Sequence, residues 1–115
     1  MKQKQEKQFP VSMTLLVLAL LEGGDKYGYQ MIRELESRSD HTFSLNEGTL
    51  YPILHGLERQ GEIRSYETAS ETGRRRKYYQ LTRQGIHSLS RKRREWQLLC
   101  TKMGKVIGGE AYASV

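Results

Sequence analysis

The chain has 115 residues, which is enough for one domain with a modest hydrophobic core. Nineteen Lys and Arg residues against thirteen Asp and Glu residues give a formal net charge of +6, which favours a polyanionic partner such as nucleic acid. The single cysteine, Cys100, excludes an intramolecular disulfide, and the apolar run 15–21 is too short to span a bilayer, so we expect a cytoplasmic protein without a membrane segment.

The first ten residues are mostly Lys, Gln and Glu and predict a flexible tail over 1–10. A first helix is expected over 11–22, and its residues are apolar on nearly every face. Such a helix must be covered on more than one side. Because a chain of this size has little to cover it with, a second subunit is the natural candidate.

A second helix is expected over 27–38, with Met31, Ile32 and Leu35 facing inward. After a polar connection, the stretch 44–61 reads as a third helix with both ends marked. Ser44 or Asn46 can cap its start, Ser44-x-x-Glu47 fits a capping box, and Gly61 stands where a helix usually ends. Its apolar face follows the helical period and consists of Leu50, Ile53, Leu54 and Leu57.

The opposite face of the third helix carries hydrogen-bonding side chains with few charges, namely Asn46, Thr49, Tyr51, His55 and Arg59. We interpret this face as one that enters the major groove of DNA. Asn46 can read adenine and the Thr49 methyl group can contact thymine. Tyr51 is expected to contact a base or a phosphate, and the alternative is that it packs on the second helix. Tyr29 is expected to turn its ring inward while its hydroxyl reaches a phosphate.

After Gly61 the pattern changes to two β-rich segments, 63–68 and 76–81, joined by a basic tip that contains Gly73. Three helices followed by such a hairpin predict a winged helix-turn-helix over 11–81. The cations at the tip are Arg74, Arg75, Arg76 and Lys77. Since alternate strand residues face opposite ways, we favour Arg74 and Arg75 for the DNA minor groove and Lys77 for a phosphate. A charge run of this kind can also be a solvated face.

Thr82 can cap a last long helix over 82–108, and 109–115 is expected to be a second flexible tail. One face of this helix repeats in heptads, through Ile86, Leu89, Arg93, Trp96, Cys100, Met103 and Ile107. We interpret this seam as a dimerisation surface; the alternative is that it folds back on its own domain. The predicted fold is therefore mainly α with a two-stranded wing and a C-terminal dimerisation helix.

Enzyme chemistry is poorly supported, and we expect no catalytic residue, cofactor or metal. The histidines at 41, 55 and 87 form no spaced cluster, Cys100 has no partner at metal-ligand spacing, and no phosphate-binding glycine loop is present. Cys100 lies on the apolar seam, where a small core residue is commoner than a reactive thiol.

Several motifs in one order resemble the PadR-like transcriptional regulators: Tyr27-Gly28-Tyr29, Gly48-Thr49-Leu50-Tyr51-Pro52, Leu57-Glu58-x-x-Gly61-x-Ile63, and Gly73-Arg74-x-x-Lys77-Tyr78-Tyr79-x-Leu81-Thr82-x-x-Gly85. The resemblance spans about 12–107, and one long C-terminal helix is similar to the short subfamily. It implies a winged helix-turn-helix that forms a homodimer through its first and last helices. It also implies a roughly palindromic operator in double-stranded DNA, usually bound for repression.

In some members of that family the dimer interface holds a pocket for flat aromatic compounds that relieve repression. Trp96 on the seam could stack on such a ligand, or it could simply fill the interface. Arg93 must be paired or face water, and either arrangement leaves polar space near Trp96. The expected effector and interface residues are Leu89, Arg93, Trp96, Cys100 and Met103.

Two other functions fit the same elements. One is a winged-helix module for protein–protein contact without DNA binding, since a fold does not fix a function. The other is a non-specific nucleoid binder. Four consecutive cations at the wing favour DNA, because a protein-binding module has no need of them.

Overall fold

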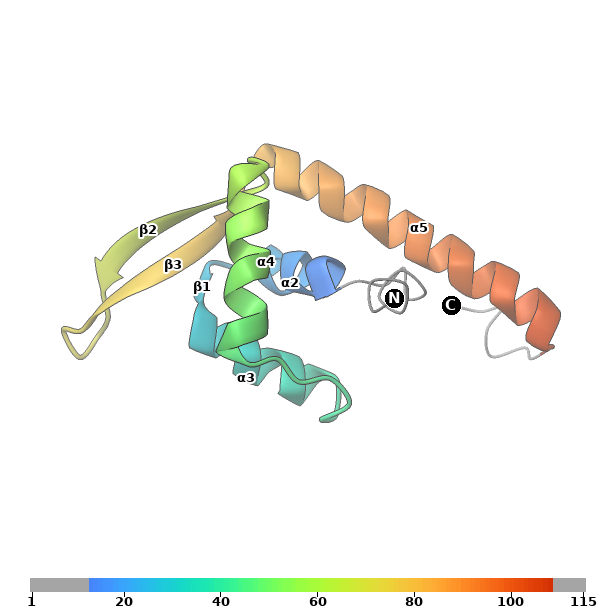
Figure 1. Ribbon diagram of the computed structural model, residues 1–115, viewed down its shortest axis with the longest axis horizontal. Coiled ribbons are helices and arrows are strands. Elements are labelled where there is room, and N and C mark those ends of the chain that lie inside the picture. Colours follow the sequence, from blue (N-terminus) through green and yellow to red (C-terminus); the bar gives the residue numbers. More distant parts are fainter. Residues whose placement is uncertain (1–12, 109–115) are drawn as a thin grey trace.

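The computed structural model describes residues 13–108, and the predicted tails 1–10 and 109–115 lie outside the described residues. It confirms the mainly helical fold with a wing (Figure 1). The elements in chain order are α2 (Met13–Glu22), β1 (Lys26–Tyr27), α3 (Gly28–Arg38), α4 (Glu47–Arg59), β2 (Ile63–Ala69), β3 (Arg75–Leu81) and α5 (Arg83–Ile107). Of the described helices, none combines the length and hydropathy needed to cross a membrane.

Helix α2 lies at the centre of the core, as its continuous apolar sequence demands. Val17 and Leu18 are fully buried, and the core also takes Met31 from α3 and Leu50 from α4. Helix α5 of the same chain packs against α2 and covers part of its surface. That a second subunit covers the rest of α2 stays a prediction.

Helix α4 begins at Glu47 and is capped by Asn46, one of the two residues expected to cap it. The Asn46 side-chain Oδ1 accepts a hydrogen bond from the Thr49 backbone N–H at 2.9 Å, which satisfies one of the free donors at the helix start. Leu50, Leu54 and Leu57 are buried, as the sequence period predicts, and Ile53 is half-buried. Gly61 follows the helix with φ of +78°, a conformation that favours glycine.

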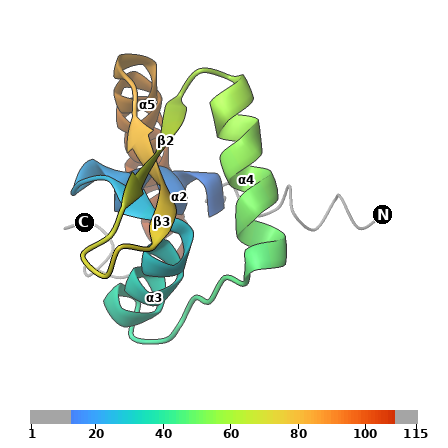
Figure 2. The same cartoon turned by 90° about the vertical axis from the view of Figure 1, so that its left-hand side faces the viewer.

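A third strand that the sequence analysis did not predict joins the wing. Residues of β1 pair with β3, as Lys26 with Tyr79 and Tyr27 with Tyr78, so the antiparallel sheet has the order β1-β3-β2. Figure 2 shows the strands of the wing with α4 to their right and α3 below them. The sheet therefore holds the wing at a fixed place beside the two helices of the helix-turn-helix.

Helix α5 is capped by Thr82, as predicted, because the Thr82 Oγ1 atom accepts a hydrogen bond from the Gly85 N–H at 3.1 Å. Gly85 and Leu89 are buried against the domain, and Leu89 is only 2% exposed. The remaining turns of α5 extend away from the wing (Figure 1). Among the described residues, Trp96 is 38% exposed and Met103 and Ile107 about half exposed, so much of the predicted seam is uncovered within the chain.

Candidate nucleic-acid interface

A groove of about 400 Å³ lies where the starts of α3 and α4 meet the wing. It brings together four side chains that the sequence analysis selected for DNA contact, namely Tyr29, Tyr51, Arg74 and Lys77. The other residues that line it are Tyr27, Gly28, Glu47 and Arg76. Three of its side chains are cationic and one is acidic, so the groove attracts an anion such as a phosphate.

Tyr51 crosses from α4 to α3 and is half-buried there. A Cβ atom on Gly28 would lie 2.5 Å from the Tyr51 hydroxyl oxygen, so the missing side chain of Gly28 makes room for this ring. Tyr51 thus packs on α3, as in the alternative considered from the sequence, while the groove still reaches its side chain. The two roles are compatible because a tyrosine has an apolar ring and a polar tip.

Asn46 and Thr49 are exposed at the start of α4. The Asn46 Oδ1 atom is held in the helix cap, so it is not free for a bidentate contact to adenine. Thr49 makes no side-chain hydrogen bond within residues 13–108 and is available to a base edge. Thr49 is therefore the better candidate of the two for reading a base.

The Tyr29 ring does not pack inward, and that expectation was wrong. Tyr29 is 54% exposed, Arg33 Nη1 donates to its hydroxyl at 3.3 Å, and the Arg33 guanidinium lies 5.5 Å from the ring centroid. The inner face of α3 is already occupied by Met31 and Leu35 and by the Tyr51 ring that packs against Gly28. Tyr29 and Arg33 together present a hydroxyl and a cation beside the groove.

The four cations of the wing have different surroundings. Gly73 at the tip has φ of +87°, which lets the chain reverse before Arg74. Arg75 Nη2 lies 3.4 Å from Glu67 on β2, and the Arg76 guanidinium lies 4.2 Å from the Tyr27 ring centroid. Arg74, Arg76 and Lys77 form no ion pair with any described residue, but Lys77 Nζ lies 5.8 Å from the Tyr79 ring centroid. Within residues 13–108, Arg74 has neither kind of partner and is therefore the wing cation best able to meet a phosphate.

A row of aromatic rings joins the wing to the domain. Tyr27 contacts Tyr78 edge to face at 5.4 Å, and Tyr78 stacks on Tyr66 at 5.9 Å. The Tyr66 hydroxyl donates to Asp25 at 2.6 Å, and this hydrogen bond raises the pKa of Tyr66 above its usual value. Sequence reasoning missed the row because its members lie far apart in the chain. The three rings connect β1, β3 and β2 across the sheet.

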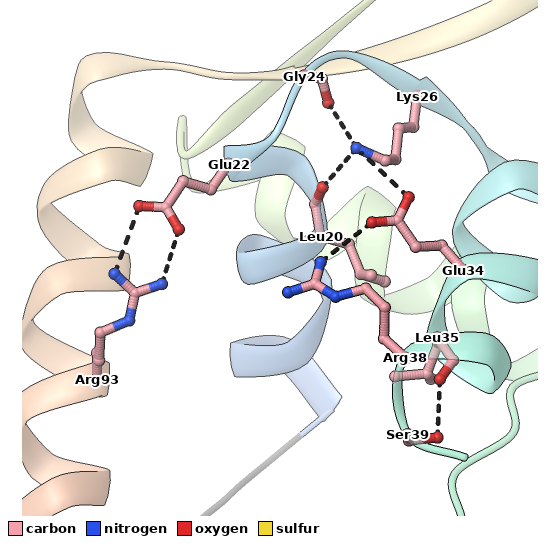
Figure 3. Close-up of polar contacts among 9 residues, drawn as sticks. All are labelled: Leu20, Glu22, Gly24, Lys26, Glu34, Leu35, Arg38, Ser39 and Arg93. Carbon is pink, nitrogen blue, oxygen red and sulfur yellow. Dashed lines mark hydrogen bonds and ion pairs between the residues drawn. The ribbon is translucent and has the colours of Figure 1, made fainter. Parts of the chain in front are cut away.

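Arg93 of the predicted seam is paired, which was one of the two arrangements considered. Its Nη2 and Nη1 atoms donate to the two carboxylate oxygens of Glu22 at 2.7 and 3.4 Å (Figure 3). The hydrogen bond from Arg93 lowers the pKa of Glu22 and raises that of the guanidinium.

The other residues of the predicted seam differ in burial. Leu89 packs into the core of its own domain, whereas Cys100 is half-buried and Trp96 and Met103 stay exposed. In residues 13–108, no group of His, Cys, Asp or Glu could hold a metal ion.

A family model described as "Transcriptional regulator PadR-like family" matches residues 17–91. A transcriptional regulator of Mycobacterium tuberculosis is 30% identical over 103 residues, which cover 90% of each chain. The crystal structure of a PadR family transcription regulator from Clostridium difficile has a TM-score of 0.71 and 36% identity, over 83% of this chain and 97% of that one. A transcriptional regulator from Clostridium thermocellum has a TM-score of 0.72 and 36% identity, over 80% and 89%. The chain therefore belongs to the PadR-like family of transcriptional regulators.

Proposed function

We propose that this regulator is a homodimer that binds a specific, roughly palindromic DNA operator and represses nearby genes in the cytoplasm. The observation that carries the proposal is the basic groove between α3, α4 and the wing. It gathers hydroxyl groups and cations from segments far apart in the sequence, all beside one exposed helix start.

On this proposal α4 enters the major groove and the wing follows the adjacent backbone. Thr49 contacts a base edge, and the hydroxyls of Tyr29 and Tyr51 bind phosphate oxygens. Arg74 reaches the minor groove while Lys77 neutralises a phosphate. Glu47 is the acidic side chain in the groove, and it repels phosphates. Its carboxylate is better suited to accept a hydrogen bond from a nucleobase, such as from the cytosine amino group.

The exposed apolar face of α5 supports the dimer. Trp96, Met103 and Ile107 lie on one seam at a/d spacing, and a water-exposed seam of this kind favours burial against a second copy. A two-fold axis would place two α4 helices in successive major grooves, about 34–36 Å apart. Each α4 helix then contacts an identical half-site, so the operator is expected to be a palindrome.

Selection from a library of random duplexes tests this function. We expect the purified chain to enrich a palindromic motif and to shift it in a gel, with competitor DNA of scrambled sequence failing to displace it. Equal retention of all duplexes would identify a non-specific binder. No retention of any duplex at low salt would leave the protein-interaction module as the better interpretation.

A small aromatic effector is the second part of the proposal, and Trp96 is the candidate contact. Trp96 is the only tryptophan of the chain, so its fluorescence reports on this one position. We expect a flat aromatic compound that stacks on Trp96 to quench that fluorescence at the concentration at which it releases the operator. If no compound of a broad panel quenches the signal, Trp96 has a packing role only.

A further inference from the structure

We propose that the ion pair between Glu22 and Arg93 sets the direction of α5 relative to the helix-turn-helix and thereby fixes the spacing of the operator half-sites. Glu22 and Arg93 are positioning residues in this account, because neither lies in the DNA groove. The inference rests on the proposed function and adds to it the determinant of spacing.

Two sets of side-chain hydrogen bonds attach α5 to the domain within residues 13–108. The first is at the start of the helix, where Thr82 Oγ1 donates to the Gly61 carbonyl at 2.6 Å and Gln84 Nε2 to the Gln60 carbonyl at 3.0 Å. The second is the pair of bonds from Arg93 to Glu22, the last residue of α2 (Figure 3). The buried contacts of Gly85 and Leu89 place the first turns of α5, and the ion pair adds a polar attachment to α2 beyond them.

The geometry of the second attachment suits this role. Two nearly parallel bonds from one guanidinium to one carboxylate restrict orientation as well as distance. The side chains of Arg93 and Glu22 are 43% and 53% exposed, and exposed pairs add little to the free energy of unfolding. Variants that lack the pair are therefore expected to fold.

A small tilt of α5 at Arg93 produces a larger displacement at the C-terminal end of the helix. At about 1.5 Å of rise per residue, the attachments at Gln84 and Arg93 are roughly 13 Å apart, and Ile107 lies roughly 21 Å beyond Arg93. A tilt of about 10° at Arg93 would thus move Ile107 by roughly 4 Å. In a dimer joined through α5, this displacement exceeds the rise of about 3.4 Å per base pair and changes the distance between the two α4 helices.

The direction of α5 can be measured without DNA. Nitroxide labels at Ser37 on α3 and Lys105 on α5, placed in a Cys100→Ala chain diluted with unlabelled protein, give one intrachain distance distribution by pulsed electron resonance. We expect a narrow distribution in the parent and at least a twofold broader one in Glu22→Gln. The charge-swapped chain Glu22→Arg/Arg93→Glu should restore the narrow form. Glu95→Gln, the same chemical change at an exposed site on α5, is the matched control.

The same variants, unlabelled, are then used in the random-duplex selection. Wild type and the charge swap should enrich one half-site spacing, whereas Glu22→Gln should enrich the same half-site at spacings that differ by one base pair or more. An unchanged distance distribution in Glu22→Gln overturns the proposal. A broader distribution with a single spacing overturns the link to operator choice. If the wild type enriches no motif, the DNA-binding function fails, while the distances still decide whether the ion pair directs α5.

Discussion

We expect Arg74→Ala to weaken operator binding by roughly 10- to 50-fold near physiological salt, because each wing of the dimer loses one contact to DNA. A contact that releases one counterion contributes a slope of about 0.9 in the logarithm of affinity against the logarithm of salt concentration, which is roughly fivefold per contact. The dimer should therefore lose about 2 units of slope. Arg74 is exposed at the wing tip, so the melting temperature should stay unchanged.

Anisotropy titrations with labelled operator from about 50 to 200 mM salt measure both quantities. Arg91→Ala is the matched control, since it removes the same charge from an exposed position on α5 away from the groove. The control should bind nearly as the wild type does. Equal affinity and an equal salt slope for Arg74→Ala and wild type would contradict the assignment of Arg74 to the DNA surface. Loss of affinity for scrambled and specific DNA alike is expected, because a wing contact of this kind reads no base.

The second large effect is expected on stability, from Gly85→Ala. A Cβ atom at Gly85 would overlap the backbone carbonyl oxygen of Glu62 and lie 3.1 Å from Leu81 Cδ2. The Glu62 carbonyl also accepts the Thr82 N–H at 3.1 Å, so it cannot turn away without loss. Overpacking of this kind costs about 3 kcal/mol. The melting temperature should therefore fall by about 10 °C or more.

Gly56→Ala provides the contrast within the same fold. Gly56 also lies inside a helix, but the nearest atom to its added Cβ is Arg59 Nη2, at 3.9 Å. Since alanine is the better helix former, this variant should gain about 0.5–1 kcal/mol. Thermal denaturation followed by circular dichroism compares the two. If the Gly85→Ala protein had the same melting temperature as the wild type, α5 would not be held closely against Glu62.

The helices and the hairpin could be predicted from the sequence because each carries a local signal. The apolar period of α4 is complete over its own residues, Gly61 ends the segment, and Thr82 caps α5 as its position suggests. These signals depend on the chemistry of neighbouring residues. They were sufficient to predict the fold class, the family and four of the side chains that line the groove.

The parts that could not be predicted depend on contacts between distant residues. Two residues of β1 are too few to show a strand period, and their pairing with β3 spans about fifty residues of chain. Arg93 on the seam indicates a charge that needs a partner, but nothing in the sequence selects Glu22. The Tyr29 ring was predicted to face inward, because hydropathy alone does not show that other side chains already occupy the inner face of α3.

The first two turns of α5 belong to the core of the winged helix, since Gly85 and Leu89 are buried there. This affects how chimeras of such regulators should be built. In a chimera joined at Thr82, Leu89 would come from the donor protein, and its side chain would not match the shape of the recipient's core. A junction placed after Arg93 would keep both attachments of α5 and exchange only the part proposed to meet a second copy. Partner choice could then be altered while the recipient's winged helix stays folded.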